Sequence, residues 1–516
     1  MTRTLKHSWL RAAFAACLAL FGAKHATAGE YVPDPSRNNG LHLLENFGLG
    51  LVAENYIGRK MVRLDNGDVI VAGEVPARSG TVGTTTIGLV RYNDEGQYVA
   101  WSNPGSNGYG GGANNRYVII PNPLTDYYVV EVRDMVVHGN QIFVLANTNS
   151  GPILNRFDAV IYVFGTDGSF SNGFIVDSAP ASARTVWGSA LAAYTVNPDT
   201  PSSSVELLYI GSRKPGAVEH IAFKRYSVGT TTGILHSWSE NTIKPSIGAC
   251  PLSIHCTASD IALGSYRVEN GIPVIPEVFI TGTRIDNPDV MSYVVQLNIR
   301  PGNLSVEEIG TFRVGPFNTR GRALVVDQDD LFMVAEADRA CKNGVAVSRF
   351  STFVAAPTYP TWTRHFGGSD EEAGFCNTPP FSHLQPTDIP FAVALQDGKL
   401  AVAGHGYRTQ AGAESITDGF VTVLNAATGA LISPATSAQR PDVPLVYYPE
   451  RNSVGDRTRH TGFKDIVASG NGTFTVTGDA RYPENYAAMP WLAGKRRYTT
   501  LRIMEAGPEI FANGFE

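Results

Sequence analysis

Six charged side chains recur near one position of a repeated pattern and are the strongest candidates for binding a ligand. Each stands just before or at the start of an apolar, strand-like run. They are Arg59, Asp134, Asp260, Arg322, Asp388 and Asp465. The third repeat offers only Thr185 or Ser189 at this position. If the runs are equivalent strands of a circular fold, these side chains gather at the mouth of a central channel and form a polar ring that binds a ligand or a cation. The alternative is a structural role, in which each charge binds neighbouring backbone or another charge between repeats, because buried polar groups need partners.

Other chemistry-bearing patterns are weak. The sequence contains no G-x-S-x-G elbow, H-E-x-x-H helix, P-loop or C-x-x-C-H haem motif. Asp327, Asp329 and Asp330 crowd one turn but lack the glycine and the alternating oxygen ligands of an EF-hand loop. His383 and His405 are the most suggestive histidines, although structural histidines are commoner than catalytic ones. We therefore predict no metal site and no cofactor, and the catalytic residues, if any, stay unknown.

The candidate residues are positioned by an internal repeat. A turn rich in Asn, Asp and Gly is followed by a β-rich run that often ends in glycine. Leu64–Gly73, Leu395–Gly404 and Ser469–Gly478 match one another closely. Weaker copies end at Asn147, Gly211, Gly282 and Glu336. Seven units of about 70 residues account for the chain after its first 28 residues, with no convincing helical period.

Each unit has the pattern of a four-stranded antiparallel meander. We place the fourth strand of the first unit at Gln97–Trp101 and that of the sixth at Ala430–Ser433. A single meander cannot bury both of its faces, so neighbouring units must stack, and radial stacking leaves only short edges. We predict an all-β fold, a single β-propeller of seven four-stranded blades. Because the last unit ends at Arg502-Ile503 without an outer strand, we expect the N-terminal segment Gly48–Tyr56 to complete it and close the ring.

Several segments also resemble known repeats. Trp362–Glu371, followed by Gln396–Gly404, resembles bacterial β-propeller repeats of the SBBP type, and Asp418–Asn425 looks like their third strand. Val90–Gly96 is similar to the delta-60 repeat of secreted bacterial proteins. These resemblances imply blades and export, and they imply no particular chemistry. The tail Ile510–Glu516 looks like a terminus that recurs on exported bacterial proteins.

The first 28 residues have the pattern of a signal peptide. Arg3, Lys6 and Arg11 precede the apolar run Ala12–Ala23, and Ala26-Thr27-Ala28 offers the small residues of a cleavage site. Cleavage after Ala28 predicts a secreted or periplasmic protein. The expected organisation is a signal peptide over 1–28, a propeller over 29–505 and a C-terminal tail over 506–516.

Composition restricts the partners. Cleavage would remove four of the 41 basic residues and leave 37 against 47 acidic ones, a net charge of −10. Nucleic-acid binding requires a basic surface, so we expect no nucleic-acid partner. No other long apolar segment occurs, so we expect no membrane span. We further expect a monomer.

Four cysteines remain after cleavage, namely Cys250, Cys256, Cys341 and Cys376. In an oxidising compartment an even number indicates disulfides. Pairing of Cys250 with Cys256 is the favoured arrangement of the three that are possible, leaving Cys341 for Cys376.

For function, the sequence favours a binding or interaction module for an extracytoplasmic ligand, glycan or protein. The alternative is an extracellular enzyme acting on a polymer, a lyase or hydrolase with its site at the channel mouth. A quinoprotein is a third, weaker alternative.

Overall fold

Within the residues that the computed structural model describes, every regular element is a β-strand. These residues are 31–34, 36–37, 43–45, 55–76, 85–104, 115–120, 127–150, 157–178, 186–200, 203–213, 219–228, 235–241, 255–269, 272–286, 288–300, 303–312, 318–339, 342–352, 360–366, 388–408, 416–432, 446–447, 460–481 and 495–505. The segment predicted as a signal peptide and the C-terminal tail lie outside them. No helix in the described part is long and apolar enough to cross a membrane.

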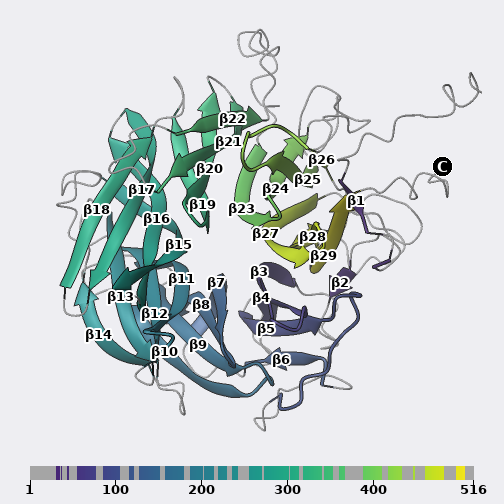
Figure 1. Ribbon diagram of the computed structural model, residues 1–516. Coiled ribbons are helices and arrows are strands. Elements are labelled where there is room, and N and C mark those ends of the chain that lie inside the picture. The colour runs from purple at the N-terminus through teal and green to yellow at the C-terminus, as the bar shows by residue number, and fades with distance from the viewer. Residues whose placement is uncertain are drawn as a thin grey trace, which may run out of the picture.

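The strands form a ring of seven antiparallel blades (Figure 1). Blade 1 holds β3 (Ile57–Arg63), β4 (Val69–Pro76), β5 (Thr85–Tyr92) and β6 (Tyr117–Ile119). Blade 2 holds β7 (Tyr127–His138), β8 (Gln141–Ser150), β9 (Phe157–Gly165) and β10 (Phe170–Ser178). Blade 3 holds β11 (Val186–Val196), β12 (Ser204–Arg213), β13 (His220–Val228) and β14 (Leu235–Asn241). Blade 4 holds β15 (His255–Glu269), β16 (Ile272–Asp286), β17 (Asp289–Arg300) and β18 (Asn303–Phe312).

The remaining blades complete the circle. Blade 5 holds β19 (Thr319–Asp327), β20 (Asp330–Arg339), β21 (Lys342–Ser351) and β22 (Trp362–Phe366). Blade 6 holds β23 (Asp388–Gln396), β24 (Lys399–Arg408), β25 (Ile416–Asn425) and β26 (Val446–Tyr447). Blade 7 holds β27 (His460–Gly470), β28 (Thr473–Arg481) and β29 (Arg496–Glu505). The predicted seven-bladed propeller is confirmed.

N-terminal strands close the ring, as predicted, and those that the structure describes precede the predicted segment 48–56. Two short strands, β1 (Tyr31–Pro33) and β2 (Leu43–Glu45), pair antiparallel with β29 and form the outer edge of blade 7. They are the purple arrows beside yellow β29 in Figure 1. Most of the predicted segment, residues 48–54, lies outside the described residues. Its described end, Asn55 and Tyr56, hydrogen-bonds to Arg496 at the start of β29 and then leads into β3.

The fourth strands of units one and six lie later in the chain than predicted. At the predicted places there are only isolated bridges, Tyr92 with Tyr98 and Leu424 with Leu431. The outer strands are instead β6 and β26, which follow long connections. The tight turns were predicted correctly: at Asp397-Gly398 both φ angles are positive, at 50° and 70°. A two-residue hairpin turn of this kind favours Asn or Asp followed by Gly.

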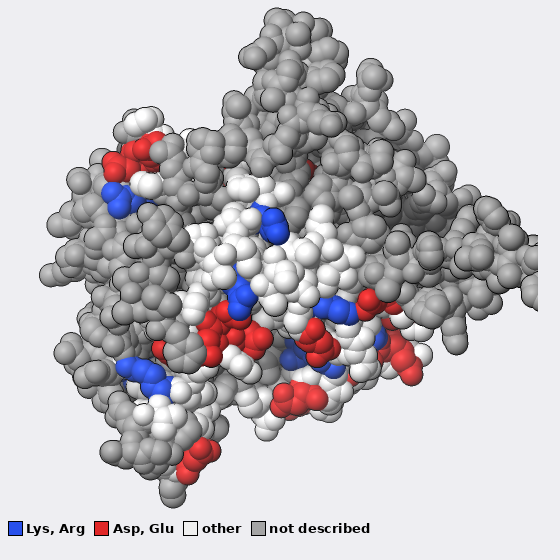
Figure 2. Space-filling view, turned by 45° about the horizontal axis from the view of Figure 1, so that its top comes forward, with Lys and Arg blue, Asp and Glu red and all other residues white. Residues whose placement is uncertain are grey.

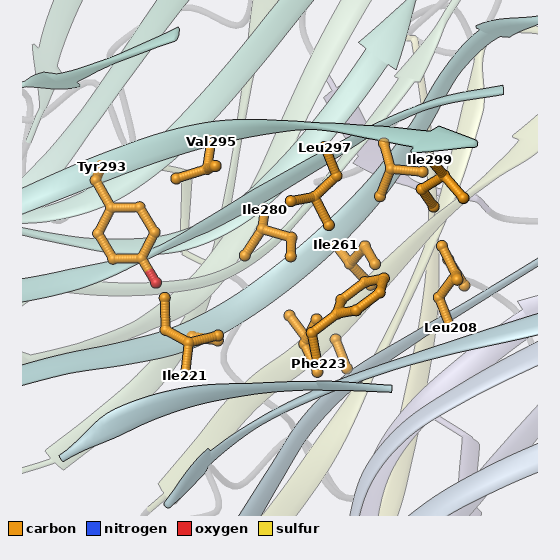
Figure 3. Close-up of a cluster of buried hydrophobic side chains, with 14 of the residues drawn as sticks. Leu208, Ile221, Phe223, Ile261, Ile280, Tyr293, Val295, Leu297 and Ile299 are labelled. Atoms are coloured by element: carbon orange, nitrogen blue, oxygen red, sulfur yellow. The ribbon is translucent and has the colours of Figure 1, made fainter. Parts of the chain in front are cut away.

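Each blade buries both of its faces against neighbouring blades. Successive side chains of a strand point to opposite faces, so alternate residues pack against different neighbouring blades. On β17, Tyr293, Val295 and Leu297 pack toward blade 3, against residues that include Leu208 and Phe223 (Figure 3). Val294, between them in sequence, packs on the other side with Leu324 of blade 5. Because side chains alternate across a strand, one strand supplies the cores of two interfaces.

Cys256 is buried at the start of β15 and is disulfide-bonded. Cys250, Cys341 and Cys376 lie outside the described residues, so the pairing of the four cysteines stays a prediction.

Candidate functional site

Every innermost strand carries a β-bulge at the same place. In each inner strand one residue has no pairing partner on the neighbouring strand, and the side chain of this unpaired residue differs in chemistry from blade to blade. From blade 1 to blade 7 the unpaired residues are Arg59, Arg133, Ser189, Ser259, Arg322, Phe391 and Lys464. All seven line a central channel of about 410 Å³. We call them the bulge ring.

The bulge requires a small residue opposite it. The residue paired with the position before the bulge is glycine or alanine in all seven blades. These residues are Gly73, Ala146, Gly211, Gly282, Ala335, Gly404 and Gly478. A Cβ on Gly282 would lie 1.8 Å from the backbone oxygen of Thr257 in the inner strand. The recurrent glycine of the sequence repeat is thus a consequence of close backbone approach at the bulge.

The bulge ring is asymmetric in charge. Arg322, Lys464, Arg59 and Arg133 stand on blades 5, 7, 1 and 2, whereas blades 3 and 4 present hydroxyls and blade 6 presents Phe391. Figure 2 shows one face of the molecule, on which basic and acidic side chains lie in small mixed groups.

A second layer, one residue further along each inner strand, is acidic. It contains Lys60, Asp134, Ala190, Asp260, Ala323, Ala392 and Asp465. Each aspartate carboxylate accepts a hydrogen bond from a backbone N–H of the next blade. Asp134 accepts from Leu191 at 2.7 Å, Asp260 from Leu324 at 2.7 Å, and Asp465 from Met61 at 2.8 Å. These three carboxylates therefore join blades, which supports the structural alternative for them.

Lys60 compensates the acidic layer. Its Nζ lies 3.6 Å from Asp134 Oδ1 and 3.7 Å from Asp465 Oδ1. Burial disfavours the charged amine, but the attraction of Asp465, Asp134 and Asp260 outweighs it and raises the pKa of Lys60. Burial also raises the pKa of Asp260, to about 7, although Lys60 pulls it down.

A second set of contacts joins blades through the residue that follows the small one. Glu74 Oε1 accepts from Val132 N at 3.2 Å, and Asn147 Oδ1 accepts from Gly188 N at 2.7 Å. Ser212 Oγ accepts from Ala258 N at 3.3 Å. In blade 6 the residue at the position of these N–H donors, just before the bulge, is Pro390, which has no N–H to donate.

Three of the four bulge-ring cations are paired with glutamates. Arg59 donates to Glu74 at 2.9 and 3.2 Å, Arg133 donates to Glu131 at 2.8 Å, and Arg322 pairs with Glu336. Burial raises the pKa of Glu74, against the pull of Arg59. These pairs hold the guanidinium groups in place at the channel wall.

Lys464 is different, because no carboxylate lies within ion-pair distance of it in the described part of the chain. Its Nζ lies 3.3 Å from His405 Nδ1 and 4.0 Å from the centroid of the Phe391 ring. Burial lowers the pKa of Lys464 to about 8; Asp479 opposes this, and Arg59, Arg496 and Arg322 add to it. Burial, Lys464 and Arg322 lower the pKa of His405 to about 3, so this imidazole is neutral at physiological pH.

The structure thus brings five of the six predicted ring residues to the channel, in two layers rather than one. Arg59 and Arg322 are bulge residues, and Asp134, Asp260 and Asp465 stand one residue later. Asp388 is the first residue of β23, is fully buried and does not line the channel. Ser189 lines it, whereas Thr185 lies outside the described residues.

The other candidates do not assemble into a site. Asp330 is bound to Arg349 at 2.8 and 2.7 Å, and the described residues contain no group of three side chains able to hold a metal ion. His383 lies outside the described residues. His405 does reach the channel region, through Lys464.

Sequence reasoning missed Lys60, Arg133 and Lys464. Each is the immediate neighbour of a residue that was chosen, in the pairs Arg59-Lys60, Arg133-Asp134 and Lys464-Asp465. Two adjacent charges within an apolar run break the alternation of a regular strand, and this was an available signal of a bulge.

No family model matches the chain, and no curated protein matches it in sequence. Solved structures that it resembles include the phage phi92 endosialidase, with a TM-score of 0.41 and 10% identity, over 90% of this chain and 69% of that one. Another is the α-L-arabinofuranosidase Arb93A from Fusarium graminearum, with a TM-score of 0.38 and 10% identity, over 72% and 93%. The Trypanosoma rangeli sialidase gives a TM-score of 0.36 and 9% identity, over 92% of this chain and 58% of that one. A mutant of it gives 0.36 and 10%, over 76% and 56%. Similarities this low carry no functional argument, and the resemblance to SBBP-type repeats stays a prediction.

Proposed function

We propose that this chain is an exported binding propeller that holds an anionic ligand at the mouth of its central channel. The observation that carries the proposal is the bulge ring, in which four of seven equivalent positions are Arg or Lys and face one channel. Lys464, the member without a carboxylate at ion-pair distance among the described residues, is the natural counter-charge for a ligand.

The chemistry of the ring suggests the kind of ligand. A carboxylate, sulfate or phosphate group would face Lys464, between Arg322 and Arg59, because charge-assisted hydrogen bonds to these groups are strong. Ser189 and Ser259 offer hydroxyls to a neutral polar part of the same molecule. A volume of about 410 Å³ suits a small organic acid or one unit of an acidic glycan.

The alternative function, a lyase or hydrolase acting on a polymer, uses the same channel mouth and is distinguished by turnover. Release of product from an acidic glycan by the purified protein alone would favour the enzyme. Binding without release would favour the module.

The proposal is tested by thermal unfolding of the purified protein with acidic sugars, organic acids and their neutral counterparts. A ligand at about 100 times its Kd adds about 2.7 kcal/mol, enough for a clear rise in Tm. We expect acids to raise Tm and neutral counterparts not to do so. The rise should disappear in Lys464→Gln and persist in Arg349→Gln, a matched cation bound to Asp330 away from the channel. No rise with any acid, or an equal rise in Lys464→Gln, would contradict the proposal.

A further inference from the structure

Two lysines share the channel but stand in opposite surroundings. Lys60 lies between the carboxylates of Asp134 and Asp465, which hold its amine in the charged form. Lys464 meets the ring of Phe391 and the imidazole of His405 instead. One amine is thus kept as an ammonium ion, whereas the other is placed where its neutral form is accessible.

The groups around Lys464 come from several blades. Phe391 and His405 belong to blade 6, Arg322 to blade 5, Arg59 to blade 1, and Asp479 and Arg496 to its own blade. Burial and the three guanidinium groups disfavour the ammonium form, and Asp479 opposes them. A lysine that is desolvated and placed beside other cations is the usual form of a nucleophilic amine in proteins.

The same guanidinium groups provide a place for a carboxylate. Arg59 and Arg322 line the channel on the two sides of Lys464, at bulge positions of blades 1 and 5. A 2-oxo acid carries a carboxylate next to a carbonyl carbon. Its carboxylate on an arginine would bring the carbonyl carbon toward the Lys464 amine, and Phe391 would exclude water from one side.

We infer that Lys464 forms an imine with the carbonyl carbon of an oxo acid bound in the channel. This inference rests on the proposed function, since it requires the anion site. The neutral amine attacks the carbonyl carbon, the carbon–nitrogen double bond forms, and the carbonyl oxygen leaves as water with the two amine protons. The condensation is reversible and needs no oxidant or reductant.

The experiment uses the purified protein with pyruvate as the probe. Sodium borohydride reduces an imine to a stable amine, and peptide mass mapping then locates the adduct. At pH 8 about half of the Lys464 amine is neutral, given its pKa of about 8, against under about 1% for an ordinary lysine. We therefore expect Lys464 to be labelled on the order of ten- to a hundred-fold more than surface lysines. Lys60, in the same channel, should stay unlabelled.

The controls separate this inference from the proposed function. Lys464→Arg keeps the charge and removes the nucleophile, so it should lose the adduct and still gain Tm with lactate, which has no carbonyl. Lys464→Gln, with its fold checked by Tm without ligand, should lose both. If lactate stabilises the wild type but Lys464 is labelled no more than surface lysines, the imine is wrong and the anion site stands. If neither lactate nor pyruvate stabilises it and no adduct forms at Lys464, both are wrong.

Discussion

Asp465 of the last blade accepts a hydrogen bond from the backbone N–H of Met61 in the first blade, at 2.8 Å. The two residues are 404 positions apart in the chain, and both are buried. This contact joins the inner strands β27 and β3 where the ring closes, while β1 and β2 close it at the outer edge of blade 7. Contacts at the inner strands and at the outer edge of blade 7 therefore both stabilise the closed ring.

Loss of the Asp465 carboxylate should weaken closure. Asp465→Ala leaves the Met61 N–H without its acceptor, and an unsatisfied buried donor costs about 1–3 kcal/mol. Asp465→Asn keeps an oxygen acceptor and should cost less. The measurement is urea unfolding of both variants beside the wild type. Equal stability of Asp465→Ala and the wild type would show that this contact contributes nothing to closure.

Asp260 should make stability depend on pH. Its pKa in the folded protein is about 7, above the usual value of about 3.9 in an unfolded chain. The folded state binds the proton more tightly, so the contribution of Asp260 is fully present below about pH 4 and is lost as the pH rises through about 7. Asp260→Asn does not titrate and keeps an acceptor for the Leu324 N–H.

We therefore expect Asp260→Asn to be more stable than the wild type at pH 8, by about 1 kcal/mol after allowance for solvent in the channel. The advantage should shrink or vanish at pH 5. Tm at the two values tests this, with Asp286→Asn, an exposed carboxylate, as the control that should show no such difference. A difference that is constant across the range would refute the titration of Asp260.

The blades could be predicted from the sequence because their signal is local. Turns such as Asp397-Gly398 require positive φ angles, and the strand that follows carries a small residue, such as Gly404, beside the bulge of the inner strand. Two repeat ends, Asn147 and Glu336, were placed one residue late, since Ala146 and Ala335 are the equivalents of Gly73. Alanine serves there as a small residue, and a pattern built on glycine passes over it.

The site was harder to predict because it depends on register across strands. Arg59 and Asp134 both precede an apolar run, but Arg59 is the bulge residue of its strand and Asp134 is the residue after the bulge. The two side chains therefore stand in different layers of the channel. Whether a charge binds backbone or faces the channel depends on the neighbouring blade, as with Asp260 and Leu324. That neighbour is more than 60 residues away, and no local pattern reports it.

Gly282 should not tolerate a side chain, because the backbone approaches it more closely than a Cβ allows. In Gly282→Ala the new Cβ would lie 1.8 Å from Thr257 O and 2.5 Å from Tyr293 Oη, so backbone must move. We expect a loss of about 2 kcal/mol or more. Gly462→Ala is the matched control, since its nearest neighbour, His405 Nδ1, is at 3.4 Å, an ordinary contact. Comparable urea midpoints for the two variants would contradict the role given to the bulge.

Among the cations of the channel, Lys60 should be the one whose substitution lowers the stability of the folded protein most. In Lys60→Met the carboxylates of Asp134 and Asp465 lose their shared counter-charge, and an uncompensated buried charge costs about 3–5 kcal/mol. Arg133→Met removes a neighbouring cation that is more exposed and paired with Glu131, so it should cost at most about 1 kcal/mol.

The cost of Lys60→Met should also depend on pH. Burial already raises the pKa of both aspartates despite Lys60. Without the lysine their pKa values rise further, so the loss of stability should be larger at pH 8, where they must ionise, than at pH 5. Tm measured at both pH values tests the sign, and a larger loss at pH 5 would mean that Lys60 is not the counter-charge of this layer.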